Sequence, residues 1–257
     1  MSNDALQFKE VSFAYNAEDA NSQRMLDSVN LNVTRGEFIS IIGASGSGKT
    51  TIFKLITGLE QPTAGKILLD GSERKDRLGH VGYMPQQDLL MPWRTIIENA
   101  ALPLEIQGVR RSEAHKRVKI LLQEFGLQGV EKKYPGDLSG GMKQRVSFLR
   151  TILSGANVLL LDEPFSALDA ITKLTMQEWL LVQWQKRENT ILFITHDVDE
   201  ALFLSDRIFV LTDTPIRELK EIVVPLSRPR TIRDMNSTEV VSLKEQLLRK
   251  LRHKVML

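Results

Sequence analysis

The stretch Gly43-Ala44-Ser45-Gly46-Ser47-Gly48-Lys49-Thr50-Thr51 decides the fold class of this 257-residue chain. It fits the pattern G-x-x-x-x-G-K-[ST] of a phosphate-binding loop. The apolar run 38–42 before it predicts a buried strand, and 49–57 after it predicts a helix ended by Gly58. Since glycines let backbone N–H groups converge on phosphates at a helix N-terminus, we interpret the stretch as a phosphate site. The alternative is a flexible glycine- and serine-rich turn.

The loop predicts Mg-ATP as the ligand. Lys49 should reach the β- and γ-phosphates, the Thr50 hydroxyl is placed to coordinate Mg²⁺, and Thr51 is a candidate for a further phosphate contact. The predicted nucleotide-binding residues of the loop are Gly43, Ala44, Ser45, Gly46, Ser47, Gly48, Lys49, Thr50 and Thr51.

A second apolar strand, 158–161, ends in Asp162 and Glu163. The carboxyl edge of a parallel sheet is where α/β folds bind ligands. Asp162 is expected to join the Mg²⁺ shell, and Glu163 to orient or deprotonate an attacking water. An acidic pair after a strand is otherwise a helix cap or a solvated loop, but the phosphate loop favours the catalytic interpretation.

The rest of the chain predicts an α/β fold around a mostly parallel sheet. Period-two alternation at 6–15 and 26–33 indicates an antiparallel N-terminal edge subdomain. Further strands are expected at 81–84, 157–162, 190–195 and 207–211, with helices at 170–186 and 197–204. We expect an ATPase domain at 1–225, a helical subdomain inserted at about 87–155, and an extension at 226–257 with an amphipathic helix at 237–253.

Composition excludes several classes of protein. The 34 basic and 32 acidic residues give a net charge of +2, which does not favour nucleic acid as a partner. The chain has no cysteine, which fits a reducing compartment. The polar start at 1–10 is unlike a signal peptide, and the apolar runs are shorter than the ~20 residues that span a bilayer. Any membrane role should therefore be peripheral.

The segment Leu138-Ser139-Gly140-Gly141-Met142-Lys143-Gln144-Arg145 makes the chain resemble the ABC ATPase family. Its serine hydroxyl and the backbone N–H groups of its glycines would be hydrogen-bond donors at the start of a helix, which predicts a second anion site. The resemblance implies that Ser139, Gly140 and Gly141 close on the γ-phosphate held by a second subunit. It thus implies a head-to-tail dimer, which we expect to be a homodimer, with two ATP molecules between the subunits.

Four further matches follow in the order that the family shows. The resemblance implies that Tyr15 stacks on adenine and that Gln86 contacts Mg²⁺. Because Gln87 follows Gln86 directly, the alternative is that Gln87 matches the family's glutamine. It implies that His196 contacts the γ-phosphate and acts in catalysis together with Glu163 and Gln86. It also implies that 166–169 passes between the two active sites, the alternative being a plain helix cap by Ser166 or Asp169.

The resemblance favours a transporter motor over the other ABC classes. No long heptad coil of the DNA-repair type lies between 51 and 138, no second cassette of the translation-factor type follows, and exporters commonly fuse the cassette to membrane helices. Segments 89–93 and 196–207 are similar to the nitrate, sulfonate and taurine importer group, which includes thiamine-precursor systems. This implies a peripheral protein on the cytoplasmic side of the membrane, beneath a permease and indirectly served by an external solute-binding protein.

Two surfaces keep alternatives open. Leu90, Met91 and Trp93 would face the permease or would lie in the core of the helical insert. The last helix, with basic residues opposite leucines, would dock on the body, on the second subunit or near anionic lipid. The transported solute cannot be identified from this chain, since in such importers other proteins contact it.

Overall fold

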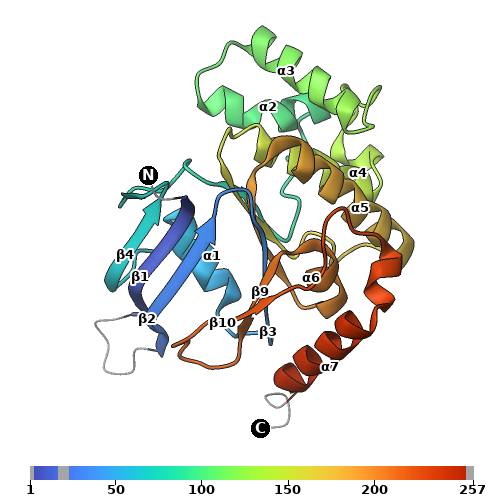
Figure 1. Cartoon of the computed structure of the whole chain (residues 1–257). Coiled ribbons are helices and arrows are strands. Elements are labelled where there is room, and N and C mark those ends of the chain that lie inside the picture. The colour runs from blue at the N-terminus through green and yellow to red at the C-terminus, as the bar shows by residue number, and fades with distance from the viewer. Residues whose placement is uncertain (1–2, 17–22, 253–257) are drawn as a thin grey trace.

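A mostly parallel sheet forms the centre of the computed structural model, which describes residues 3–16 and 23–252 (Figure 1). The strand order is β10-β9-β3-β8-β7-β6, and all neighbours are parallel except β10 and β9. The strands are β3 (Phe38–Gly43), β6 (Gly82–Met84), β7 (Val158–Asp162), β8 (Thr190–Thr195), β9 (Arg207–Leu211) and β10 (Lys220–Val223). Every residue of β3, β7 and β8 is buried, as expected for strands covered on both faces. The predicted fold class is confirmed.

The N-terminal strands form a sheet of their own. Its order is β2-β1-β4-β5, with antiparallel pairing throughout. The strands are β1 (Asp4–Tyr15), β2 (Gln23–Thr34), β4 (Ala64–Leu69) and β5 (Ser72–Glu73). Helix α1 (Lys49–Thr57) lies between this sheet and the central one, and its Ile52, Phe53 and Ile56 share a core with both (Figure 1). The antiparallel prediction for β1 and β2 is confirmed, whereas β4 and β5 were not predicted.

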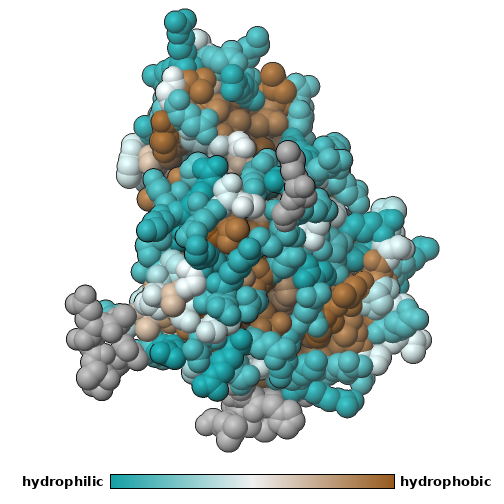
Figure 2. All heavy atoms as spheres, turned by 60° about the vertical axis from the view of Figure 1, so that its left-hand side comes forward, coloured by the Kyte–Doolittle hydropathy of each residue, from teal (hydrophilic) through white to brown (hydrophobic). Residues whose placement is uncertain are grey.

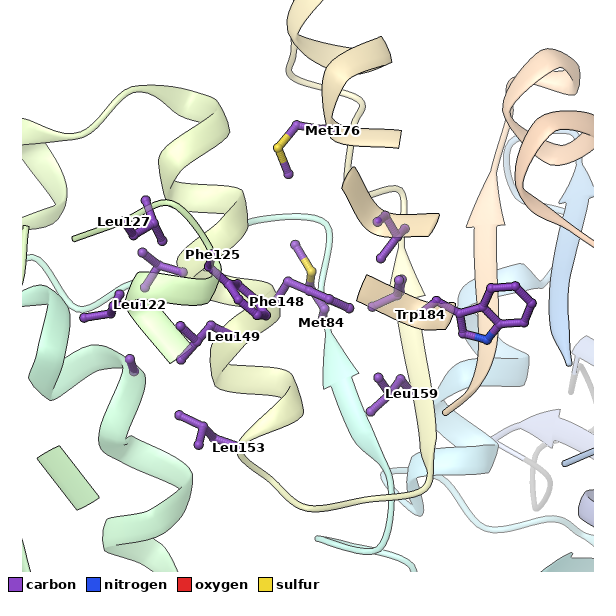
Figure 3. Packing of buried hydrophobic residues seen from close by; sticks show 14 of the residues in the cluster. Met84, Leu122, Phe125, Leu127, Phe148, Leu149, Leu153, Leu159, Met176 and Trp184 are labelled. Carbon is purple, nitrogen blue, oxygen red and sulfur yellow. The ribbon is translucent and has the colours of Figure 1, made fainter. Parts of the chain in front are cut away.

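Three helices build a lobe beside the central sheet, at the top of Figure 1. They are α2 (Ile96–Ile106), α3 (Arg111–Glu124) and α4 (Gly140–Ile152), with a short 3-10 turn, η1 (Pro135–Asp137), before α4. Phe125 and Phe148 of the lobe share one apolar cluster with Met84 and Leu159 of the sheet (Figure 3). The lobe therefore packs onto the sheet near β6 and β7. The loop between β6 and α2 leads from the sheet to the lobe.

The chain after β10 lies along helix α6. Helices α5 (Ala170–Arg187) and α6 (Val198–Leu204) flank the sheet, and η2 (Ile232–Asn236) and α7 (Thr238–Arg252) follow. The Arg230 side chain donates to the carbonyls of Leu202 and Ser205 at the end of α6. Val240 and Leu247 of α7 are buried in the core that contains α6. Of the three alternatives for the last helix, the structure shows packing on the body.

The described part of α7 is amphipathic, as predicted, and its Lys244 Nζ lies 2.6 Å from Asp199 Oδ1 at the start of α6. The predicted helix end at His253 and the N-terminal residues Met1 and Ser2 lie outside the described residues. Across 3–16 and 23–252, no helix has the length and hydropathy that a membrane span requires. Figure 2 shows a mostly hydrophilic face with hydrophobic patches, one of them on the upper lobe.

Candidate active site

The start of α1 is built to receive an anion. Gly48, the residue before the helix, has a φ of 96°, and a Cβ there would lie 2.9 Å from Ile216 Cδ1. No side chain caps this end of α1, and its first turn contains no acidic residue. The N–H groups of a helix start that lack a cap are available to a ligand, and the helix dipole favours negative charge there.

A cavity of about 500 Å³ opens in front of this helix start. Its lining residues are Met25, Ser45, Gly46, Ser47, Gly48, Lys49, Thr50, Thr51, Gln86, Glu163 and His196. Among the described residues, the buried Ser47 Oγ has no hydrogen-bond partner. An unpaired buried hydroxyl costs about 1–3 kcal/mol, which a ligand oxygen would offset. The cavity thus brings the phosphate loop together with three of the predicted catalytic side chains.

Lys49 lies folded against its own loop. Its Nζ donates to the Gly43 carbonyl at 2.9 Å and to the Ala44 carbonyl at 3.0 Å. Burial lowers the pKa of Lys49, while the negative charges of Glu163 and Asp162 act in the opposite direction. A buried ammonium held mostly by neutral carbonyls is a strong attractor for phosphate oxygens.

Asp162 ends β7 as a buried carboxylate. Tyr83 of the neighbouring strand β6 donates its hydroxyl to Asp162 Oδ2 at 3.3 Å. Burial raises the pKa of Asp162 and the charge of Glu163 raises it further, against the hydrogen bond from Tyr83 and the charge of Lys49. Burial, with the nearby Asp162 carboxylate, also raises the pKa of Tyr83 to about 12. The positive charge of Lys49 therefore offsets only part of the repulsion between the two carboxylates.

The donor set around Asp162 fits a magnesium ion. Thr50 hydrogen-bonds to Asp162, and Gln86 lines the same cavity, so hydroxyl, carboxylate and amide oxygens are all present. No group of three or more His, Cys, Asp or Glu residues that could hold a metal occurs within 3–16 and 23–252. Mg²⁺ typically takes one or two protein carboxylates and completes its shell with water and phosphate oxygens, so these few ligands suit it.

Glu163 is the meeting point of three strand ends. Its Oε2 accepts from Gln86 Nε2 at 3.2 Å and lies 3.3 Å from His196 Nδ1. Gln86 follows β6, Glu163 follows β7 and His196 follows β8. Glu163 has a φ of 45°, in the left-handed region that few non-glycine residues adopt. Gln86, and not Gln87, lies in the cavity wall.

Comparison with known proteins settles the family. The ABC transporter family model matches residues 26–166, which is more than half of the chain. This chain belongs to the ABC transporter family. It is 45% identical to the formylaminopyrimidine import ATP-binding protein ThiZ of Halalkalibacterium halodurans, over 97% of this chain and 95% of that protein. It is 37% identical to the aliphatic sulfonates import ATP-binding protein SsuB of Bacillus cereus, over 91% of each.

Two solved structures resemble this chain, and the first of them agrees with the assignment to the ABC family. A dimeric ATP-binding cassette in a post-hydrolysis state, bound to ADP and Pi, is 30% identical and superposes with a TM-score of 0.74, over 86% of this chain and 100% of that one. CbiO1 of Clostridium perfringens, part of an ABC transporter complex, shares the fold with a TM-score of 0.78 over 100% of both chains. The chain is an ATP-binding ATPase, as predicted.

The second anion motif of this ABC ATPase does not line the cavity. Ser139 precedes α4 and caps it, because its Oγ accepts from the Met142 N–H at 3.4 Å. A Cβ at Gly141 would lie 3.0 Å from Thr172 Cγ2, and one at Gly140 would lie 3.3 Å from a Leu168 methyl. The motif is thus packed against the segment 168–172 and is not joined to the phosphate loop within one chain.

Tyr15 stands beside the phosphate loop but outside the cavity wall. Its hydroxyl lies 3.2 Å from Thr51 Oγ1, and its ring lies edge-on to Phe13 with centroids 4.8 Å apart. Its proposed stacking on adenine stays a prediction. The segment 166–169 ends in Asp169, whose carboxylate caps α5 by accepting from two backbone N–H groups. The cap that was the alternative interpretation of this segment is present.

Two residues of the site were not foreseen. Met25 lines the cavity from the start of β2, where Ile216 pairs with it through the Ile216 N–H and the Met25 carbonyl at 2.8 Å. Tyr83 reaches Asp162 because β6 and β7 are parallel neighbours. In the sequence, Met25 reads as an ordinary strand residue, but Tyr83 lies in the strand predicted at 81–84, only three residues before Gln86.

Proposed function

We propose that this ABC ATPase is the motor subunit of an importer, binding Mg-ATP and hydrolysing it between two copies of the chain. The observation that carries the proposal is the convergence of Gln86 and His196 on the Glu163 carboxylate, in a cavity whose floor is the phosphate loop. The expected base, the two side chains that contact it and the phosphate loop thus line one cavity, as hydrolysis by in-line attack requires.

Glu163 holds the attacking water in this mechanism. Its carboxylate accepts a proton from the water as the water attacks the γ-phosphorus, and the hydrogen bond from Gln86 orients it. Lys49 and His196 neutralise charge that spreads over the phosphoryl oxygens. Thr50, Asp162 and Gln86 would hold Mg²⁺, which supplies positive charge to the phosphate oxygens when it is bound.

A second copy of the chain completes each site. Ser139, Gly140 and Gly141 stand outside the cavity of their own chain at the start of α4, where Ser139 and Gly140 are exposed and Gly141 is buried. A helix start of this kind attracts an anion, so we assign it to the γ-phosphate of the partner. The dimeric form of the similar cassette bound to ADP and Pi supports this arrangement.

The loop between the cavity and the helical lobe suits contact with a permease. It starts at Gln86 and leads to Trp93, which is 74% exposed, whereas Leu90 is buried in the lobe core. The two alternatives for this segment therefore apply to different residues. A hollow of about 550 Å³ lies beside Trp93 and is lined by Trp93, Arg94, Glu98, Glu105, Gly108, Val109 and Arg111. A permease element in this hollow would be linked to the active site through Gln86.

Import of a small anion or organic solute is the cargo class that we propose. It rests on the similarity to import subunits for formylaminopyrimidine and for aliphatic sulfonates. Nitrate, taurine and thiamine precursors are further candidate solutes of this class. The chain would lie on the cytoplasmic side of the membrane and would meet an external solute-binding protein only through the permease.

Affinity purification from gently solubilised native membranes tests this role. We expect the tagged protein to bring down a protein with several membrane spans, and the Trp93→Ala variant to recover less than about a fifth as much of it, because the exposed indole is removed from the docking surface. Ile120→Ala, which removes an exposed apolar side chain of α3, is the matched control. Recovery of ribosomal or DNA-repair proteins in place of a membrane protein would refute the importer role. Recovery of a membrane protein that carries an ATPase cassette of its own would instead indicate an exporter.

A further inference from the structure

An ion-pair cluster joins α5 to α6 next to His196. Lys173, in the first turn of α5, places its Nζ 2.7 Å from Asp197 Oδ2 and 2.7 Å from Glu200 Oε1. The side chain of Glu200 is 5% exposed and that of Lys173 is 23% exposed. Asp197 and Glu200 lie at the start of α6, which begins two residues after His196 (Figure 1). The cluster therefore links two helices through one buried carboxylate and two partly exposed side chains.

Lys173 and Asp197 favour each other's charged forms. Burial lowers the pKa of Lys173, but the hydrogen bonds and charges of Asp197 and Glu200 outweigh this effect and raise it above its usual value. Burial likewise opposes ionisation of Asp197, but the contact with Lys173 keeps the pKa of that carboxyl below its usual value. Removing the ammonium would leave the buried Glu200 carboxylate without a cationic partner, although Gln177 and Thr195 still donate hydrogen bonds to it, and this weakens the link between the helices.

The same cluster forms hydrogen bonds with the residues on both sides of His196. Thr195, directly before it, donates its hydroxyl to Glu200 Oε2 and accepts from the Asp197 N–H at 3.0 Å. Asp197, directly after it, accepts from the Glu200 N–H at 3.3 Å through Oδ1. The His196 side chain is itself 63% exposed, and its Nδ1 lies 3.3 Å from Glu163 Oε2. Its position thus depends on the neighbouring backbone.

We propose that Lys173 is a positioning residue for His196: by tying α5 to Asp197 and Glu200, it sets where the imidazole stands relative to the γ-phosphate. The inference rests on the proposed role of His196 in hydrolysis. Lys173 lies four residues after Asp169, so it also connects the segment 166–169, which we expect between the two active sites, to the histidine. A change in that segment on dimer closure would reach His196 through Lys173, whose ion pairs to Asp197 and Glu200 lie beside a further hydrogen bond from Gln177 Nε2 to Glu200 Oε1 at 3.3 Å.

Steady-state ATPase kinetics of the full chain test the proposal. Lys173→Met should lower kcat about 10- to 100-fold, because small misplacements of a group near the reacting phosphate are costly. The KM for ATP should change less than about two-fold, since Lys173 does not line the cavity. Lys173→Arg should recover most of the activity, because a guanidinium can bridge both carboxylates. Lys186→Met, which removes an exposed lysine from the last turn of α5, is the control and should behave as wild type.

A double-mutant cycle with His196→Ala separates positioning from a general structural effect. If Lys173 acts through His196, adding Lys173→Met to His196→Ala should lower kcat by less than about two-fold further. If the double variant instead shows a loss in kcat equal to the product of the losses in the two single variants, the inference is overturned. A normal kcat in Lys173→Met, when His196→Ala is slow, would overturn it as well. A normal kcat in His196→Ala would instead refute the role of His196 in the proposed function, and the inference with it.

Thermal unfolding shows whether Lys173→Met folds. If it does not, the double variant Lys173→Gln with Glu200→Gln takes its place, because two neutral amides leave no unpaired buried charge. The same loss in kcat with an unchanged KM is expected of it. Wild-type kcat in this folded variant would overturn the inference.

Discussion

Glu163→Gln is expected to bind ATP as the wild type does and to hydrolyse it about 10²- to 10⁴-fold more slowly, the range that general-base catalysis contributes. The amide keeps the size of the side chain and can still accept a hydrogen bond from Gln86, but it cannot take a proton from water. The variant should therefore accumulate as an ATP-bound dimer. Single-turnover hydrolysis and the mass of the protein with ATP measure both effects.

The control for this variant is Glu178→Gln. Glu178 is an exposed residue of α5, so the same chemical change is made away from the cavity. It should hydrolyse ATP at the wild-type rate and should not accumulate as a dimer. Turnover of Glu163→Gln near the wild-type rate would remove Glu163 from the role of base, and His196 would then be the next candidate at this position.

Lys49→Ala is expected to weaken ATP binding roughly 10- to 100-fold, because a hydrogen bond to a charged group contributes about 1.5–3 kcal/mol. The buried ammonium held by the Gly43 and Ala44 carbonyls is the positive charge of the loop itself. Its loss leaves Asp162 and Glu163 facing the phosphates with less compensation. Titration with a fluorescent ATP analogue measures the affinity.

Lys119→Ala serves as the control for this second variant, because Lys119 lies on the exposed face of α3 in the helical lobe. It carries the same loss of one positive charge, so a general electrostatic effect on the anionic ligand would appear in both proteins. Equal weakening in the two variants would contradict a specific contact between Lys49 and the phosphates.

The central strands and their helices could be predicted from the sequence because burial on both faces demands continuous apolar runs. The strands predicted at 190–195 and 207–211 and the helix at 49–57 have the bounds that the structure shows. Strands β5 and β10 were missed since β5 is two residues long and β10 is mostly exposed, so neither carries a hydrophobic pattern. β4 was missed because only its second half is apolar and buried.

The order of the motifs located most of the candidate site, but not its contacts. Asp162, Glu163 and His196 could be placed at one sheet edge because parallel strands end on the same side. The pair formed by Lys173 and Glu200 and the bond from Tyr83 to Asp162 depend on how helices and strands far apart in the sequence pack. The split of 89–93 into a buried Leu90 and an exposed Trp93 likewise follows from the turn that the backbone makes there.

The domain bounds at 1–225, about 87–155 and 226–257 stay predictions. The lobe helices from Ile96 to Ile152 fall within the expected insert. Residues 226–252 contain η2 and α7 but are joined to the body by Arg228, whose guanidinium lies 4.2 Å from the Trp184 ring centroid, and by Arg230. Whether the extension unfolds with the body or apart from it depends on these contacts.

The central claim, that each active site is shared by two chains, can be tested by cross-linking Ser45→Cys with Ser139→Cys in the Glu163→Gln background. The chain has no cysteine, so only the two introduced thiols can form a disulfide, and both positions are exposed. We expect a covalent dimer on a non-reducing gel that requires ATP and both substitutions in the protein. A protein that stays monomeric with ATP and oxidant, or dimerises equally without ATP, would contradict it.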